Sequence, residues 1–163
     1  MKNREEIVFD KEDIDYLYWL SGSLAGCIQA SQGDPQYLID LPSIKWLLEN
    51  AIAVNPTWQN GTLSAAMMSV YLNDLSGDKN AQKTALTYFD LAEKQSNGSN
   101  ASIYVTLAEN YAVSKQDKKL FIELLDKAIN IDLNKNKSLK QSNKLSQSRA
   151  KWLKSRVDDL FYM

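Results

Sequence analysis

The chain has 163 residues, of which 44% are hydrophobic and 24% charged, and its formal net charge is −1. This composition is ordinary for one soluble globular domain, and the charge supplies no general attraction for nucleic acid or an anionic membrane. Histidine is absent and cysteine occurs once, which excludes an internal disulfide and removes the commonest general base and most zinc sites.

The first twelve residues are predicted to be a flexible N-terminal segment that precedes one helical domain over 13–163. In this segment Lys2 and Arg4 are mixed with acidic residues, unlike the basic-then-apolar layout of a secretion signal. No later apolar run reaches the roughly 18 residues that a membrane-spanning helix requires.

The first of seven expected helices covers about 13–30. Tyr16, Leu20, Leu24 and either Cys27 or Ile28 recur at helical spacing, which predicts the buried stripe of this helix. Residues 24–27 match the short pattern before a lipid-modified cysteine in bacterial lipoproteins, but acidic residues stand close upstream. We therefore expect Cys27 to be a small buried residue at a helix contact.

The other expected helices are separated by turn-forming residues. Their ranges are 42–54, 60–72, 79–95, 102–113, 117–131 and 138–161. Thr57 or Asn60 is expected to cap the second of these. We expect pairing in chain order, 13–30 with 42–54, 60–72 with 79–95, and 102–113 with 117–131, with the last helix covering the end of the stack.

A three-residue pattern recurs in the second helix of each expected pair. Its copies are Ile44, Leu48, Ala51; Ala85, Phe89, Ala92; and Phe121, Leu125, Ala128. Offsets of four and three place these residues on one helix face, where alanine lets a neighbouring backbone come close. The spacing resembles the tetratricopeptide repeat. The predicted fold is all-α, a right-handed stack of tetratricopeptide-like helix pairs with a long C-terminal capping helix.

The last helix is basic. Eight Lys or Arg residues and no Asp or Glu lie between Lys135 and Arg156. Such a run is most often a solvated face, and the alternatives are an acidic partner, a membrane surface or nucleic acid. Only Trp152 supplies an aromatic ring, so the stacking platform of a single-strand binder is missing and no nucleic-acid partner is expected.

An ordered set of short segments carries a family resemblance. These are 18–20, 34–35, 40–42, 47–56, 60–61, 88–92, 111–117, 121–125 and 149–153. Over 16–161 the set resembles the T-component of TRAP transporters, the tripartite ATP-independent periplasmic systems. The resemblance implies a non-enzymatic helical protein that associates with the substrate-binding component. It also implies oligomers in some members and a cleft or pore for a hydrophobic ligand.

The resemblance further implies a periplasmic location, usually with a lipid anchor. Family members carry a signal peptide, a lipidated cysteine and a further helical stretch before the matched region, and we expect this chain to lack a signal peptide. Such a chain would be a trimmed form of a longer protein, a truncated paralogue or a cytoplasmic relative.

Seven residues are candidate contacts for a ligand or protein partner: Tyr18, Trp19, Trp58, Asn60, Tyr71, Tyr104 and Tyr111. Three aromatic residues within 16–19 cannot all face one core, so at least one is expected in a groove or interface. Trp58 and Asn60 lie where a helix is expected to begin. They are either a packed ring and a capping residue, or an aromatic and polar pair at the mouth of a pocket. Tyr104 and Tyr111 are either groove lining or core edge, because first helices line the concave side of such stacks.

The pattern of polar residues offers no catalytic, metal or cofactor site. Asp126 and Asp132 are too far apart on their helix to share a substrate proton, and no glycine-flanked nucleophile occurs. The sequence thus predicts a non-catalytic binding protein. A carrier or sensor for a small hydrophobic molecule, independent of a transporter, and a generic protein-interaction scaffold are the alternatives.

Overall fold

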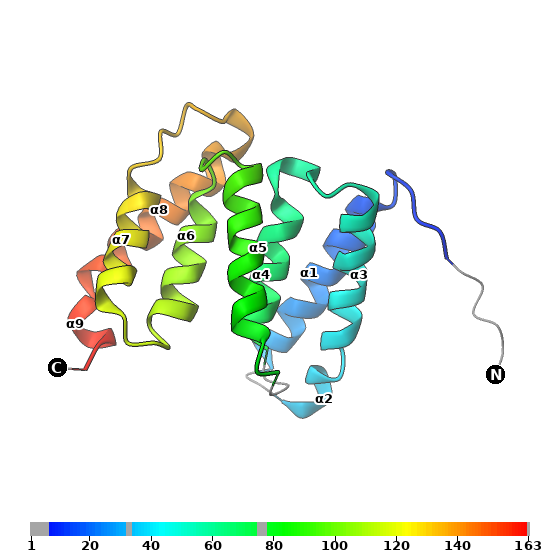
Figure 1. Ribbon diagram of the computed structural model, residues 1–163, viewed down its shortest axis with the longest axis horizontal. Coiled ribbons are helices and arrows are strands. Elements are labelled where there is room, and N and C mark those ends of the chain that lie inside the picture. The colour runs from blue at the N-terminus through cyan, green and yellow to red at the C-terminus, as the bar shows by residue number, and fades with distance from the viewer. Residues whose placement is uncertain (1–6, 32–33, 75–77, 163) are drawn as a thin grey trace.

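The computed structural model describes residues 7–31, 34–74 and 78–162, which form helices without any strand (Figure 1). The longer helices are α1 Ile14–Ala30, α3 Leu41–Val54, α4 Thr62–Leu72, α5 Ala81–Gln95, α6 Ala101–Leu107, α7 Lys118–Ile129 and α8 Lys140–Ser155. The short elements are α2 Pro35–Leu38, α9 Val157–Leu160, the 3₁₀ turns Trp58–Asn60 and Lys137–Leu139, and a π-helical turn Ala108–Ala112. The all-α prediction is confirmed.

The helices pack as pairs in chain order. α1 packs on α3, α4 on α5, and α6 on α7, while α8 lies against both α6 and α7. Figure 1 shows the three pairs side by side, with α7, α8 and α9 at the end that carries the C-terminus. The predicted pairing and the terminal covering helix are both confirmed.

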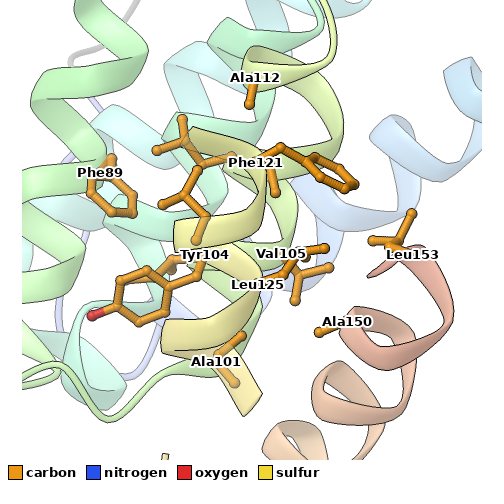
Figure 2. Packing of buried hydrophobic residues seen from close by; sticks show 14 of the residues in the cluster. Phe89, Ala101, Tyr104, Val105, Ala112, Phe121, Leu125, Ala150 and Leu153 are labelled. Carbon is orange, nitrogen blue, oxygen red and sulfur yellow. The ribbon is translucent and has the colours of Figure 1, made fainter. Parts of the chain in front are cut away.

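The recurring alanine pattern lies in the core. Ala51, Ala92 and Ala128 are each 0% exposed, and the six bulky or small partners of the pattern are buried with them. One buried cluster joins α1, α3 and α4, and a second extends from α4 and α5 to α8. Figure 2 shows Ala150 and Leu153 approaching the second cluster from the C-terminal helix.

The buried face of α1 differs from the predicted stripe. Ile14, Leu17 and Ser21 face α3, whereas Tyr16 and Leu20 are 76% and 51% exposed. The prediction was wrong here because apolar side chains occupy all of 16–20, so that several stripes fit the same periodicity. Docking on α3 selects the stripe in which small Ser21 lies between the larger side chains.

Cys27 is exposed, not buried as the sequence predicted. It lies on the same side of α1 as Leu20, seven residues earlier, because a separation of seven residues is close to two helical turns. The shift of the buried stripe thus accounts for both corrections.

The α4–α5 pair comes closest where α4 begins. Gly61, not Thr57 or Asn60, is the N-cap of α4, with a φ of 86°, and Asn60 before it also has a positive φ. A Cβ on Gly61 would lie 2.8 Å from the Cβ of Gln95 and 3.3 Å from the Cα of Ala92. Gln95 also accepts a hydrogen bond from Ser64 at 2.8 Å. The second alanine of the pattern therefore faces a glycine that has no space for a side chain.

Replacing Gly61 with alanine is expected to lower the free energy of unfolding by about 2–3 kcal/mol. The added methyl group both strains a left-handed backbone and displaces α5. Urea denaturation measures the loss. Gly98→Ala is the matched control, because Gly98 has a φ of 65° but its Cβ would meet only the Tyr104 hydroxyl, at 3.5 Å. Equal losses in the two variants would contradict a close contact at Gly61.

The C-terminal helix is interrupted, although the sequence predicted one helix over 138–161. α8 ends before Arg156, whose φ of −113° and ψ of 16° are not helical, and α9 follows as a separate short helix. The break turns the chain so that Phe161 is buried with its ring 5.1 Å from that of Phe121. Burial of this aromatic pair stabilises the turn in place of further helix.

Two amide side chains of α8 form hydrogen bonds with backbone groups at or near the ends of neighbouring helices. Asn143, only 1% exposed, accepts from the Ala101 N–H at 2.8 Å and donates to the Ser99 carbonyl at 2.7 Å. Gln147 donates to carbonyl groups at the end of α7, the nearest being that of Ile131 at 2.8 Å. These contacts join α8 to α6 and α7 through groups that each helix end leaves free.

The N-terminal segment is only partly described. Residues 1–6 of the segment predicted to be flexible lie outside the described residues. From residue 7 to α1 the chain has no helix, yet the Phe9 ring lies 5.6 Å from that of Trp46 on α3.

Candidate functional site

A cleft of about 1020 Å³ opens on the side of the stack to which the first helix of each pair contributes. α1, α4 and α6 all line it, and residues of α2 and α3 complete its wall. Most of the wall is apolar, and its larger aliphatic members are Ile28, Leu38, Leu41, Ile44, Leu48, Val70 and Leu72. Size and lining are those of a pocket for a small molecule with a largely apolar body.

Small residues on α1 leave the space open. Gly22, Ala25 and Gly26 line the cleft, and a Cβ built on either glycine meets nothing within 4 Å. Glycine inside a helix is less stable than alanine by roughly 0.5–1 kcal/mol. No packing contact of these two glycines offsets the lower helix stability. Their effect is to leave the cleft open beside α1.

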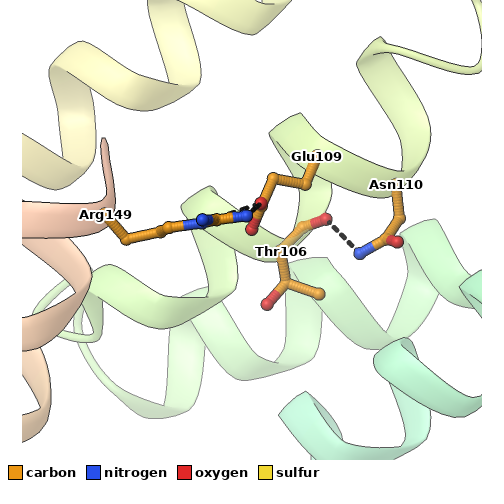
Figure 3. Close-up of polar contacts among 4 residues, drawn as sticks. All are labelled: Thr106, Glu109, Asn110 and Arg149. Carbon is orange, nitrogen blue, oxygen red and sulfur yellow. Dashed lines mark hydrogen bonds and ion pairs between the residues drawn. The ribbon is translucent and has the colours of Figure 1, made fainter. Parts of the chain in front are cut away.

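Polar side chains enter the wall from α1, from α4, and from α6 and the turn that follows it. Asn73 donates to the Ser69 carbonyl at 2.8 Å, and Asn110 donates to the Thr106 carbonyl at 3.0 Å. Each amide is therefore held against its own helix. The same arrangement occurs at α4 and at α6, which are the first helices of two successive pairs. Figure 3 shows the second of these pairs beside Glu109.

Glu109 lies in a π-helical turn, Ala108–Ala112, where the wider backbone follows directly on α6. Such turns are rare and occur frequently at functional sites. Its Oε1 atom accepts from Nε of Arg149 at 3.0 Å and from Nη2 at 2.5 Å (Figure 3). Among the described residues that line the cleft, Glu109 is the one Asp, Glu, Lys or Arg residue.

Tyr18, Trp19 and Trp58 are brought together by the structure. The Tyr18 ring lies 5.1 Å from that of Trp58 and 5.4 Å from that of Trp19. Burial raises the pKa of the Tyr18 hydroxyl, which therefore stays protonated at neutral pH. Tyr18 and Trp19 line the cleft, whereas Trp58 contacts Tyr18 and lies outside the described lining, and Asn60 is exposed in the same 3₁₀ turn as Trp58.

The three other candidate residues lie apart from this group and outside the cleft lining as described. Tyr71 stacks on Tyr88 with ring centroids 5.9 Å apart, and Lys45 lies over its ring. Tyr111 is half-buried, with Lys115 over its ring.

Tyr104 is 4% exposed, and its hydroxyl donates to Glu93 at 2.9 Å. Burial first, and then the Glu93 carboxylate, raise the pKa of Tyr104. It too lies outside the described cleft lining.

Sequence reasoning missed the glycines of α1 and the polar residues of α4 and α6. One signal was present, because Ser69 and Asn73 repeat the spacing of Thr106 and Asn110 at matching places in successive pairs. A polar pair four residues apart occurs on many exposed helices, however, and it becomes informative only once the first helices are known to share a cleft.

A second exposed feature lies on α1 next to the cleft. Tyr16, Trp19 and Leu20 are 76%, 67% and 51% exposed, and with Asp15 and Ser23 they surround a shallow hollow of about 570 Å³. We call Tyr16, Trp19 and Leu20 the α1 aromatic face. Large apolar side chains gathered in this way on one helix are typical of an interaction surface.

The basic face of α8 is partly neutralised by the protein itself. Within the described ranges, Arg149 pairs with Glu109, Lys154 with Asp126, and Arg156 with Asp159. Arg149 also lies 4.4 Å from the ring centre of Trp152. These pairs are compatible with the solvated face that the sequence predicts.

Two further classes of feature are absent from the described residues. Those residues contain no cluster of three or more metal-ligating side chains of the His, Cys, Asp or Glu type. None of their helices combines the length and the apolar character needed to span a bilayer.

Comparison with known proteins adds two findings. The model of the family described as TRAP transporter T-component matches residues 7–161. An uncharacterized protein of Treponema pallidum (strain Nichols) is 24% identical over 149 residues, which are 91% of this chain and 46% of that protein. The chain thus spans about half the length of this relative.

Proposed function

The chain belongs to the TRAP transporter T-component family, and from that premise we propose that it is a non-catalytic binding protein that docks the substrate-binding component of such a transporter. We also propose that its cleft holds a small hydrophobic ligand and that the protein works in the periplasm. The family match over nearly the whole chain is the observation that carries the first of these proposals.

The α1 aromatic face is the surface that we assign to the docked component. Its three large side chains are exposed, unlike those of the helix-pair core, and they surround a hollow that suits one anchoring side chain of a partner. Aromatic anchors in such positions carry most of the binding free energy of an interface. Trp19 belongs to both the face and the cleft, so a docked partner would lie next to a bound ligand.

The cleft supports the ligand part of the proposal. Its volume, apolar wall and few polar groups match the common features of small-molecule sites. The same observation favours a second candidate function, a carrier or sensor for a hydrophobic molecule that works without a transporter. Binding of the substrate-binding component separates the two.

The test is calorimetric titration of the protein with the purified substrate-binding component. The double variant Tyr16→Ala and Leu20→Ala is expected to weaken binding at least tenfold, because it removes two anchors that do not line the cleft. Leu145→Ala is the matched control, since Leu145 is 74% exposed but lies on α8. It should change the affinity less than twofold. Absence of binding to the component would refute the docking proposal, and equal losses in both variants would refute the assigned surface.

A further inference from the structure

The polar groups of the cleft define which end group a hydrophobic ligand can carry. We propose that the cleft selects an amphiphile whose polar end donates hydrogen bonds, an amine or a hydroxyl group, and that it rejects a carboxylate. Glu109 is the residue that we assign to this end group. The inference rests on the proposed role of the cleft as a ligand site and adds the chemical class of the ligand.

The leucines of the wall and its one carboxylate come from different parts of the stack. The leucines of the wall belong to α2, α3 and the end of α4, and they are Leu38, Leu41, Leu48 and Leu72. Thr106, Glu109 and Asn110 enter from α6 and the π-helical turn, on the opposite side of the α4–α5 pair (Figure 1). A ligand lying along the cleft would thus place an apolar body near α1 to α3 and a polar end near Glu109.

The serine hydroxyl groups of the wall have already used their protons. Ser21, Ser23 and Ser69 each donate to a backbone carbonyl of their own helix, at 2.7, 2.8 and 3.1 Å. A serine hydroxyl has one proton, so these three groups can offer a ligand only acceptor lone pairs. They favour a ligand that donates.

Glu109 adds a stronger acceptor. Both hydrogen bonds from Arg149 go to Oε1, and no other described protein group donates to Oε2. The side chain is 28% exposed, so a ligand can reach it. A carboxylate with a free oxygen accepts from an amine or hydroxyl and forms its strongest bond with a protonated amine.

The cation that pairs with Glu109, Arg149, lies outside the described cleft wall. Arg149 is held by Glu109 and does not belong to the lining, and the remaining polar members are neutral amides, hydroxyl groups and an indole. The neutral groups can donate weakly to a ligand carboxylate, whereas Oε2 of Glu109 can only accept. Because Arg149 already pairs with Oε1, the discrimination arises at Oε2, which can accept a hydrogen bond from an amine or a hydroxyl group but cannot donate one to a carboxylate.

The experiment titrates the protein at pH 7 with three ligands of equal chain length, decylamine, decanol and decanoate, below their aggregation concentrations. Binding is measured by calorimetry and by intrinsic tryptophan fluorescence, to which Trp19 in the cleft wall contributes together with the three other tryptophans. We expect decylamine to bind most tightly and decanoate at least tenfold more weakly than decanol. Decanoate that binds as tightly as decylamine would overturn the inference.

The variant Glu109→Gln removes the charge and leaves Arg149 without its carboxylate. Decylamine should then lose at least tenfold in affinity, decanol should change little, and decanoate should gain. Glu123→Gln, an exposed acidic residue on α7 that does not line the cleft, is the control and should change none of the three. A uniform change for all three ligands in Glu109→Gln would refute the role of Glu109.

The outcomes separate the inference from the proposed function. Binding of decanol without discrimination between the amine and the carboxylate would refute the inference and leave the hydrophobic site standing. Failure of all three ligands to bind would refute both the inference and the proposed ligand site. Docking of the transporter component is judged independently, by the variant of Tyr16 and Leu20.

Discussion

Replacing Asn143 with leucine is expected to lower the free energy of unfolding by about 3 kcal/mol. Asn143 is 1% exposed, and its amide is the partner of the Ala101 N–H and the Ser99 carbonyl, which are themselves buried. Leucine fills a similar volume but leaves both backbone groups without a partner, at about 1–3 kcal/mol each. Chemical denaturation followed by circular dichroism measures the change.

Lys144→Leu, at the next position of α8, is the control for this prediction. Lys144 is exposed, so its replacement should change stability by no more than about 0.5 kcal/mol. If the two variants were equally stable, Asn143 would not join α8 to the start of α6. The C-terminal helix would then be held by apolar packing alone.

Filling the α1 side of the cleft is expected to remove ligand binding without damaging the fold. In the double variant Gly22→Leu and Gly26→Leu, two branched side chains enter space where a Cβ meets no other atom. Affinity for decanol should fall at least tenfold. Thermal stability should rise or stay the same, because leucine favours the helix more than glycine does.

Gly26→Ala separates the two effects. A methyl group in the same open space should raise the free energy of unfolding by about 0.5–1 kcal/mol and leave decanol binding within about twofold. If the double leucine variant kept full affinity for decanol, the ligand site would lie elsewhere. If it lost stability, the space beside α1 would not be open in solution.

The architecture could be predicted because the helix-pair core has a specific pattern. Alanine at a fixed offset from two bulky residues, as at Ala51, Ala92 and Ala128, occurs where one backbone approaches another. The pattern can be recognised in the sequence because a larger residue at these positions would push the helices apart. The pairing then follows from chain order and short connections.

Local details were less predictable where several solutions have similar energy. The run 16–20 is apolar around the whole helix, so only packing on α3 decides that Leu17 is buried and Tyr16 exposed. The cap of α4 depends on the close approach of Gly61 to Ala92, which is a contact between distant segments. The break at Arg156 depends on the burial of Phe161 in the same way.

The candidate site was only partly visible in the sequence. Tyr18 and Trp19 stood out because large aromatic residues are unusual in such density. Gly22, Gly26 and Glu109 did not, because an empty space and one free carboxylate oxygen are properties of assembled helices. A hollow has no sequence pattern of its own, since it consists of side chains that are absent from several helices at once.

The docking of the transporter's substrate-binding component on the first-helix side is tested most directly by amide hydrogen exchange. The protein is measured alone and with that component, and the exchange of each helix is compared. We expect slower exchange in α1, Ile14–Ala30, and unchanged exchange in α7 and α8. Protection confined to α8, or none in α1, would contradict the proposed binding side.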